Sequence, residues 1–240
     1  MTEHKPLRLE LDVGNTRIKW RLCSQIGVVQ QGCDLKLDIS FDQASPDWLC
    51  KVSEVWVSSV HQNQNDWVES IFPNAQYAVS KGSQAGVYNS YSDPVKMGVD
   101  RWLAMLAARA LNKTSSHIII DAGTAITLDV IDSSGQHLGG YICPGLNMMK
   151  FALLGGTNKV VAGQDWVLGR DPGTSTQLCV DHGIQDMVVS WLESHIHKHP
   201  EAEVSISGGD GKMLSELLGL QKKYYPDLVL DGLNISFKNK

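Results

Sequence analysis

The sequence lacks the signatures of several common enzyme classes. Its 240 residues contain no G-x-x-x-x-G-K-[ST] phosphate loop, no G-x-S-x-G nucleophile elbow and no H-E-x-x-H zinc motif. No apolar stretch is long enough to span a membrane, and no signal-like apolar core precedes the first expected strand. As far as motifs go, these absences exclude P-loop enzymes, hydrolases with a nucleophile elbow and zincins. They also favour a cytoplasmic protein without a membrane partner.

An excess of positive charge is missing too. Lys and Arg number 21 against 26 Asp and Glu, which gives a net charge of −5. Because a nucleic-acid-binding protein needs a basic face to neutralise phosphates, no nucleic-acid partner is predicted. The five cysteines form no C-x-x-C pair. This pattern favours reduced thiols in a reducing compartment and disfavours a zinc site.

What the sequence does contain is a strand–turn–strand pattern that occurs twice. Alternation over residues 7–13 predicts a strand with one buried face, and the turn at Gly14-Asn15 leads into a second alternating stretch, so that the two form a hairpin. The apolar run Ile118–Ile120 predicts a buried strand that enters another hairpin. Asp12-x-Gly14 in the first turn recurs as Asp121-x-Gly123 in the second.

The remaining pattern extends both halves of the chain. Strands are expected at 55–60, 138–142, 204–207 and 228–230, and helices at 101–111, 146–154, 183–197 and 211–219. The polar connector Lys113–Ser116 gives an N-terminal lobe over 1–113 and a C-terminal lobe over 114–240. Two similar α/β lobes suggest a duplicated unit with a ligand in the cleft between them.

The first turn has the residue types that a phosphate tail and its metal require. The turn glycine lets backbone N–H groups approach an anionic oxygen, Asn15 and Thr16 add side-chain donors, and Lys19 adds positive charge. Asp12 at the strand end can hold Mg²⁺ directly or through water. The alternative is an ordinary hairpin in which Asp12 and Asn15 stabilise the turn.

The second turn, Asp121–Thr127, strengthens the phosphate interpretation, because two such turns are hard to explain by turn chemistry alone. Asp121 ends a strand that is predicted to be buried, where an unpaired carboxylate is costly. A bound cation is one natural partner for it. Backbone donors within its own turn are the other.

A third constellation is Gly98-Val99-Asp100-Arg101-Trp102. Asp100 stands near a predicted helix start, where it either caps the helix or accepts a proton from a substrate hydroxyl. Arg101 either anchors an anionic substrate or pairs with a surface acid. The turn Gly208–Asp210 favours a structural role with a minor nucleotide contact at the following helix.

Five motifs then occur in one order: Asp12-x-Gly14-Asn15-Thr16-x-x-Lys19, Tyr91-x-x-Pro94, Gly98-x-Asp100-Arg101-Trp102, Asp121-x-Gly123-Thr124-Ala125-x-Thr127 and Gly139-Gly140-x-Ile142-x-Pro144-Gly145. In this order they resemble type III pantothenate kinase, over about residues 7–183. That family belongs to the actin/hexokinase/Hsp70-like ATPase superfamily. The resemblance implies an α/β fold with two similar lobes of the actin/hexokinase-like (ribonuclease H-like) type and an inter-lobe cleft, in agreement with the duplicated pattern.

The resemblance also implies an activity and a set of roles. The activity is ATP-dependent phosphorylation of pantothenate to 4′-phosphopantothenate, the first step of coenzyme A biosynthesis, with Mg²⁺ and a monovalent cation (K⁺ or NH₄⁺), in a homodimer. Asp100 is implied as the catalytic base, Asp121 as the monovalent-cation ligand and Asp12 as a candidate Mg²⁺ ligand. The implied ATP-binding residues are Asp12, Val13, Gly14, Asn15, Thr16, Arg17, Ile18, Lys19 and Thr124, and the implied pantothenate-binding residues are Tyr91, Gly98, Val99, Arg101 and Thr176.

The sequence departs from the family pattern in two places, both at the expected rim of the substrate pocket. Residues 157–161 lack a Thr-Ala-x-Leu-Pro-like segment, and the stretch Gly169–Thr176 is longer than usual. Two other functions stay open. One is a kinase of the same fold for another small hydroxylated substrate, because fold does not fix substrate. The other is a nucleotide-binding regulator without turnover.

Overall fold

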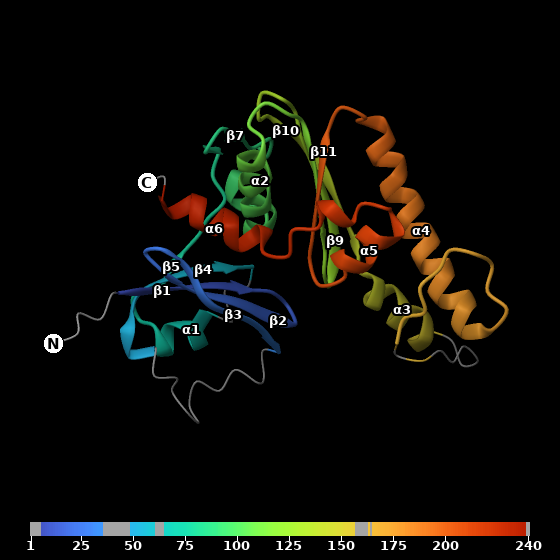
Figure 1. Ribbon diagram of the computed structural model, residues 1–240, viewed down its shortest axis with the longest axis horizontal. Coiled ribbons are helices and arrows are strands. Elements are labelled where there is room, and N and C mark those ends of the chain that lie inside the picture. The colour runs from blue at the N-terminus through green and yellow to red at the C-terminus, as the bar shows by residue number, and fades with distance from the viewer. Residues whose placement is uncertain (1–5, 36–48, 61–64, 157–162, 164, 239–240) are drawn as a thin grey trace. The chain divides into compact units, whose positions relative to one another are not determined.

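The computed structural model describes residues 6–35, 49–60, 65–156, 163 and 165–238, and the chain divides into two compact units (Figure 1). The first unit comprises residues 1–111 and 227–240, and the second comprises residues 112–226. The boundary after residue 111 lies close to the expected one after 113. The C-terminal segment differs from the expectation, because the described residues 227–238 pack with the first unit and not with the second.

The first unit is built on a five-stranded sheet with the strand order β3-β2-β1-β4-β5. The strands are β1 (Leu7–Val13), β2 (Arg17–Ser24), β3 (Gly27–Leu35), β4 (Val52–Ser59) and β5 (Gln76–Tyr77). β1 and β2 form the expected antiparallel hairpin, β3 continues it, and β4 runs parallel to β1. The other elements of this unit are the short helix α1 (Asn65–Ile71), the small hairpin β6 (Ser83–Gln84) and β7 (Val87–Tyr88), and the helices α2 (Val99–Leu111) and α6 (Leu228–Lys238).

The second unit repeats this topology with a four-stranded sheet of order β10-β9-β8-β11. The strands are β8 (His117–Ala122), β9 (Ala125–Ile131), β10 (His137–Pro144) and β11 (Glu203–Ser207), and the helices are α3 (Leu146–Gly155), α4 (Thr176–Lys198) and α5 (Gly211–Leu217). Again a hairpin is extended by a third antiparallel strand, and the first strand has a parallel neighbour on its other side. The duplicated α/β unit inferred from the two Asp-x-Gly turns is therefore present in the tertiary structure.

β1 is buried on both faces, although its alternating sequence predicts one buried face. Leu9 and Leu11 pack with Val57 of β4 and Val68 of α1 in a cluster of apolar side chains. Glu10 points to the opposite face, and it is also fully buried. The reason is that α6 covers this second face and contacts both β1 and β4.

Glu10 is tolerated in the interior because it is fully paired. Its Oε2 accepts a hydrogen bond from Arg21 Nε at 2.7 Å, and its Oε1 accepts from Arg8 Nε at 2.9 Å and from Asn234 Nδ2 at 3.0 Å. Arg21 Nη1 also donates to Asp231 Oδ1 at 2.6 Å. Burial by itself lowers the pKa of Arg21, but the hydrogen bonds to Asp231 and Glu10 outweigh burial and raise it. Since Asp231 and Asn234 belong to α6, this network fastens the C-terminal helix to the sheet.

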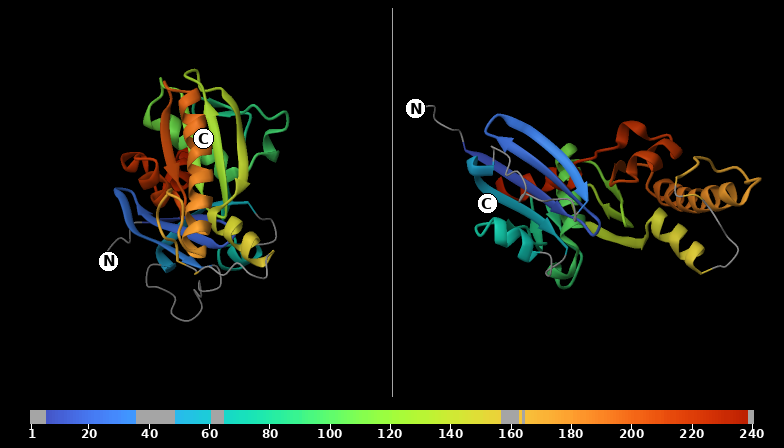
Figure 2. Two further views of the ribbon diagram at one scale, coloured as in Figure 1. Left: turned by 90° about the vertical axis from the view of Figure 1, so that its right-hand side faces the viewer. Right: turned by 90° about the horizontal axis from the view of Figure 1, so that it is seen from below.

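The strand expected at 228–230 is wrong, because these residues begin helix α6. The three consecutive apolar residues at 228–230 resemble a short buried strand, so they hid the helical spacing of the segment. The buried residues of α6 are Leu228, Val229, Leu230, Gly232, Leu233, Ser236 and Phe237. Figures 1 and 2 show α6, in red, beside the green helix α2. Phe237 also stacks on Trp56 of β4 with ring centroids 4.9 Å apart. Packing against two distant elements decides the conformation of this segment.

α4 begins at Thr176 and not near the expected residue 183. Ser175 is its N-cap, and the Ser175 hydroxyl accepts a hydrogen bond from the backbone N–H of Leu178 at 3.3 Å. With 23 residues, α4 has a mixed surface of apolar and polar side chains. Within the described parts of the chain, no helix combines the length and the apolar character needed to cross a membrane.

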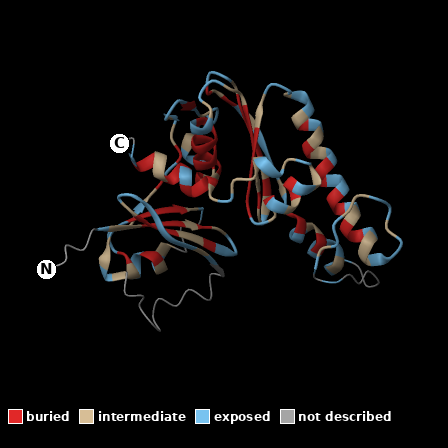
Figure 3. Ribbon diagram, in the orientation of Figure 1, coloured by how far each residue is buried: buried red, intermediate tan, exposed pale blue. Residues whose placement is uncertain are grey.

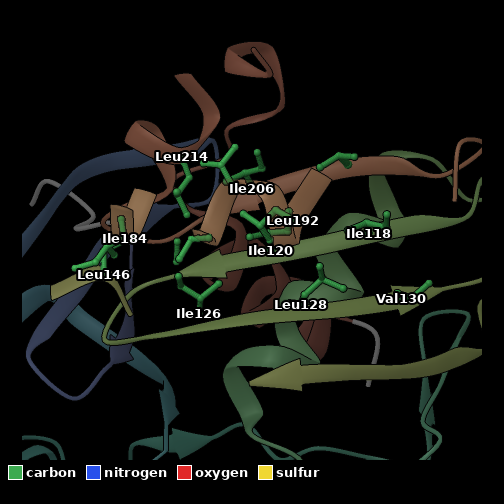
Figure 4. Close-up of a cluster of buried hydrophobic side chains, with 14 of the residues drawn as sticks. Ile118, Ile120, Ile126, Leu128, Val130, Leu146, Ile184, Leu192, Ile206 and Leu214 are labelled. Atoms are coloured by element: carbon green, nitrogen blue, oxygen red, sulfur yellow. The ribbon is translucent and has the colours of Figure 1, made fainter. Parts of the chain in front are cut away.

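The core of the second unit lies between its sheet and the helices α4 and α5 (Figures 3 and 4). Ile118 and Ile120 of β8 and Leu128 of β9 are fully buried, and they pack with Leu192 of α4 and Leu214 of α5. The continuous apolar run of β8 is thus the central strand that the sequence predicts. This core holds β8 and its terminal turn in place.

The contact between α2 and α6 predicts an asymmetry between two helical glycines. A Cβ on Gly232 would collide with the backbone carbonyl of Leu103, whereas a Cβ on Gly183 in α4 would meet nothing within 4 Å. We expect Gly232→Ala to lower the free energy of unfolding by about 3 kcal/mol, because the backbones must separate. Gly183→Ala, the matched control, is expected to raise it by roughly 0.5–1 kcal/mol.

Urea denaturation of both variants and the wild type measures the two effects. Equal stabilities of the two alanine variants would show that the close contact between α2 and α6 does not exist in solution.

Candidate active site

The first Asp-x-Gly turn places a carboxylate opposite a lysine. Asp12 and Lys19 are direct partners in the β1–β2 pairing, so they occupy adjacent positions on neighbouring strands. The turn is closed by a hydrogen bond from Gly14 N to Arg17 O at 3.1 Å, and a Cβ on Gly14 would lie 3.1 Å from that oxygen. The two half-buried charged side chains therefore stand beside a tight turn whose geometry favours glycine.

The other predicted residues of this turn fall into two groups. Asn15, Thr16 and Arg17 are exposed at the tip of the hairpin. Val13 and Ile18 are 2% and 3% exposed and belong to the apolar cluster of the sheet. Their side chains hold the turn on the sheet, and only their backbone groups can serve a phosphate.

The second Asp-x-Gly turn has the same place in its own unit. Asp121 is paired with Thr127 across the hairpin and with Ser207 of the parallel strand β11. A hydrogen bond from Gly123 N to Ala125 O at 2.9 Å closes the turn. Thr124 is exposed at the tip, and Asp121 is half-buried at the end of β8. The two turns thus have equivalent positions in two equivalent sheets.

Two glycines that were not among the predicted site residues, Gly145 and Gly208, pack against this second turn. A Cβ on Gly145 would collide with the carbonyl oxygen atoms of Gly123 and Thr124, and Gly145 N donates to Thr124 O at 2.9 Å. A Cβ on Gly208, whose φ is +91°, would collide with Ala122 O and would lie 2.5 Å from Asp121 Oδ1. In the sequence, each of these glycines directly follows a strand, and this position was the feature that could have indicated its close packing.

Each of the two Asp-x-Gly turns offers one carboxylate, Asp12 or Asp121, as a ligand for a cation. Among the described residues, no group of three or more His, Cys, Asp or Glu side chains could hold a metal ion. A single carboxylate such as Asp12 suits Mg²⁺ that is bound mainly by phosphate oxygens and water. Asp121 Oδ1 and the carbonyl oxygen of Ala122 both lie against Gly208. Oxygen atoms of these two kinds are ligands that suit a monovalent cation.

Asp100 is the second residue of α2 and not its N-cap. The backbone carbonyl of Gly98 accepts from Trp102 N at 3.1 Å, so Gly98 occupies the cap position. Asp100 Oδ1 accepts from the neighbouring Arg101 N at 2.8 Å. A Cβ on residue 98 would lie 2.6 Å from that carboxylate oxygen. Glycine at 98 therefore makes room for the Asp100 carboxylate.

Arg101 is 5% exposed, and its charge is directed toward Tyr91. Arg101 Nη1 donates to the Tyr91 hydroxyl at 3.0 Å, and the guanidinium carbon lies 5.8 Å from the centre of the tyrosine ring. Val99, the first residue of α2, is also buried. The structure therefore brings together Tyr91, Gly98, Asp100 and Arg101, which the sequence places in two separate motifs.

Thr176 belongs to the second unit, where it borders a pocket of about 830 Å³ at the start of α4. The pocket is lined by Leu153 of α3, the loop Gly173–Ser175 and the first turns of α4, namely Thr176, Cys179, Val180, Gly183, Ile184 and Met187. The lining includes the hydroxyl groups of Thr174, Ser175 and Thr176 together with several apolar side chains. The residues 157–161, which depart from the family pattern, lie outside the described residues.

The loop before α4, longer than the family pattern, is anchored on that helix by buried polar groups. Lys150 of α3 and Asp181 of α4 form an ion pair of 2.8 Å and are 3% and 0% exposed. Burial raises the pKa of Asp181, but Lys150, the Val167 N–H and Gln177 together lower it below its usual value. These bonds fix the loop that leads to Thr176.

Arg170 adds a second anchor for the same loop on the surface of α4. Its guanidinium donates to Asp186 at 3.0 Å, to Glu193 at 2.8 Å and to Ser190 at 3.0 Å. The three partners lie on one face of the helix, so a single side chain spans two helical turns. The additional residues in this stretch are thus held in a defined conformation.

Comparisons with known proteins agree with this geometry. The family model described as type III pantothenate kinase matches residues 8–198. A type III pantothenate kinase of Marinobacter nauticus is 34% identical over 235 residues, which cover 94% of this chain and 96% of the relative.

Two solved structures share the fold of the whole chain. A protein from Campylobacter jejuni, described as a Baf family transcriptional activator, superposes with a TM-score of 0.62 at 20% identity and covers 96% of this chain and 97% of its own. The activator of 2-hydroxyisocaproyl-CoA dehydratase from Clostridium difficile, solved with bound ADPNP, superposes with a TM-score of 0.52 at 12% identity, covering 97% and 94%. The α/β fold is that of the actin/hexokinase-like ATPases.

The contact between residue 98 and Asp100 generates a structural prediction. We expect Gly98→Ala to turn the Asp100 carboxylate away and to break its bond to Arg101 N, because the new methyl group would occupy its place. The stability loss should be only about 1 kcal/mol, the value of one hydrogen bond. A crystal structure and a thermal melt of the variant test both statements.

Gly82→Ala is the control, since its Cβ would lie 3.8 Å from Pro94, an ordinary contact. An unchanged Asp100 side chain in the Gly98→Ala structure would contradict the prediction.

Proposed function

This chain belongs to the type III pantothenate kinase family, and from that premise we propose that Asp100 is the general base of its reaction. The protein is a pantothenate kinase, which transfers the γ-phosphoryl group of ATP to the hydroxyl group of pantothenate and forms 4′-phosphopantothenate and ADP. This reaction belongs to coenzyme A biosynthesis. No observation favours either alternative, a different hydroxylated substrate or a regulator without turnover.

The observation that carries the proposal is the grouping of Asp100, Arg101 and Tyr91 at the start of α2. In the transfer, the hydroxyl oxygen bonds to the γ-phosphorus while the bond from that phosphorus to the bridging oxygen of ADP breaks. The hydroxyl proton passes to the Asp100 carboxylate. Most of the remaining catalysis in phosphoryl transfer is positioning and charge stabilisation.

We propose that pantothenate is held by Tyr91, Gly98, Val99, Arg101 and Thr176. The carboxylate of pantothenate needs a cationic partner, and the guanidinium of Arg101 can bind two oxygens at once. Because Arg101 is adjacent to Asp100 in sequence, the anchor and the base are carried by the same helical turn. Gly98 leaves room for the Asp100 carboxylate, and Val99 would contact pantothenate through its backbone. The Thr176 hydroxyl lines the pocket of the second unit.

ATP and a divalent metal are the cofactors of this kinase family. We propose that residues 12–19 of the first unit bind the phosphates through the backbone of the turn, through Asn15 and Thr16, and through Lys19. In the second unit, the exposed Thr124 is proposed to donate to the nucleotide. Asp12 would hold Mg²⁺, which neutralises charge on the phosphate oxygens when bound.

We propose further that the active protein is a cytoplasmic homodimer. Support for a dimer comes from apolar side chains on the edge strand β10 and on α3, where Ile142 is 64% and Phe151 is 66% exposed. Met148, which lies three residues before Phe151 on α3, is exposed as well. An apolar surface of this kind usually meets a partner protein.

The role of Asp100 predicts a large kinetic effect with little structural change. In an ADP-release assay with pantothenate, ATP, Mg²⁺ and K⁺, we expect Asp100→Asn to reduce kcat roughly 10²–10⁴-fold, the contribution of general base catalysis. The KM for ATP should stay within about twofold, because binding does not need the base. An asparagine can still accept the hydrogen bond from Arg101 N.

Asp132→Asn is the matched control, because Asp132 has a structural role in its own turn, where its carboxylate accepts hydrogen bonds from Ser134 N and Gln136 N. A folded Asp100→Asn protein with near-normal kcat would mean that the base is another group. Turnover with a different hydroxy compound and none with pantothenate would refute the assignment of the substrate.

A monovalent cation at Asp121 is the second proposal with a direct test. A carboxylate beside the phosphates of ATP adds negative charge to a site that already carries an excess, and K⁺ or NH₄⁺ bound there would relieve the repulsion. We expect higher rates in K⁺ or NH₄⁺ than in Na⁺, and we expect Asp121→Asn to abolish this difference. Rates measured with the chloride salts at constant ionic strength check this, with Asp132→Asn as control. Equal wild-type rates in all three salts would eliminate the cation site.

A further inference from the structure

Asn89 connects three segments of the first unit through its side chain and backbone. It follows strand β7, and its backbone N–H donates to Gly82 O at 2.8 Å across the small hairpin. Its side-chain Nδ2 donates to Lys81 O at 3.2 Å and lies 3.5 Å from Met97 Sδ. One half-buried side chain thus joins the hairpin to the residue that precedes Gly98.

The oxygen of the same Asn89 side-chain amide binds the backbone of Tyr91. Asn89 Oδ1 accepts a hydrogen bond from the backbone N–H of Tyr91 at 2.9 Å. This bond fixes the direction in which the chain leaves the hairpin, and hence the direction of the Tyr91 side chain. The Tyr91 hydroxyl then meets Arg101 Nη1 at 3.0 Å.

The point to which Asn89 is attached is itself rigid. Met97 is 3% exposed, and its carbonyl oxygen accepts a hydrogen bond from the buried Ser80 hydroxyl at 2.9 Å. Gly98 follows directly and begins the turn that carries Asp100 and Arg101. The two segments that meet at the Tyr91–Arg101 bond are therefore held in register by Asn89.

Asparagine suits this position because it offers a donor and an acceptor on one short side chain. Aspartate would keep the acceptor for Tyr91 N but would face Lys81 O with a second oxygen. Alanine would remove both bonds. The amide of Asn89 therefore provides both the donor and the acceptor that these two hydrogen bonds require.

From these contacts we infer that Asn89 is a positioning residue for pantothenate binding, which holds Tyr91 against Arg101. The inference rests on the proposed function, in which Tyr91 and Arg101 contact pantothenate. Asn89 itself touches neither substrate. Its effect is to keep the tyrosine hydroxyl and the guanidinium in one fixed arrangement before pantothenate arrives, so that binding does not have to order them.

The test compares Asn89→Ala and Asn89→Asp with the wild-type protein in the ADP-release assay. We expect Asn89→Ala to raise the KM for pantothenate about tenfold and to leave kcat and the KM for ATP within about twofold, because the transition-state groups are intact. Asn89→Asp should recover part of the loss, since it retains the bond to Tyr91 N. Amide hydrogen exchange at Tyr91, measured by NMR without any substrate, should accelerate in Asn89→Ala and remain slow in Asn89→Asp.

The matched control is Asn112→Ala. Asn112 makes the same pattern of bonds, accepting from Thr114 N at 3.1 Å and donating to Glu203 at 2.5 Å, but it belongs to the second unit. We expect Asn112→Ala to lose about as much stability as Asn89→Ala but to keep the wild-type KM for pantothenate. This result would show that the raised KM of Asn89→Ala does not come from general destabilisation.

The outcomes distinguish this inference from the proposed function. A wild-type KM for pantothenate in Asn89→Ala, with a raised KM in Arg101→Ala, would overturn the role of Asn89 and leave the function standing. Unchanged Tyr91 amide exchange in Asn89→Ala would also overturn it, whatever the substrate. No turnover of pantothenate by the wild-type protein would refute the proposed function instead.

Discussion

The buried carboxylate of Glu10 is the constraint on which the arrangement of the first unit depends. A charge in the interior must be paired, and the partners of Glu10 come from the sheet and from the C-terminal helix. The ion pairs therefore fasten α6 to the sheet, and α6 in turn packs against α2 at Gly232 and Leu103. Since α2 carries Asp100 and Arg101, the last residues of the chain support the proposed catalytic groups.

A shared topology explains why the two Asp-x-Gly turns are alike. In each unit the aspartate is the second-to-last residue of a strand that has an antiparallel neighbour on one side and a parallel neighbour on the other. In such a position the strand is an inner, buried strand of the sheet, and the turn that follows it lies at the end of the strand, where it can reach solvent. The second turn is further restrained by Gly145 and Gly208, which pack where any side chain would collide. Rigid support of this kind suits a group that must bind phosphates without rearranging.

The groups at the start of α2 are ordered by their neighbours before any ligand binds. Asp100 is held by the Arg101 N–H and by the space at Gly98, and Arg101 is held by the Tyr91 hydroxyl. Burial of Arg101 strengthens its interaction with an anion, because water competes less there. The proposed base and the proposed anchor thus share one short segment, so the distance between them is set by a single helical turn.

The sequence alone determined the two hairpins, the buried strand β8, the residue types of both turns and the Asp100-Arg101 pair, because these depend on local alternation and on motifs of a few residues. It could not determine that 228–230 are helical, that Glu10 is buried or that α4 begins at Thr176. Each of these depends on contacts between residues far apart in the chain. Likewise, the bond between Tyr91 and Arg101 joins two motifs that are separate in the sequence, and the Asn89 side chain contacts both of their segments, at Tyr91 and at Met97. Local patterns encode which groups are present, whereas packing and the pairing of buried polar groups decide where those groups meet.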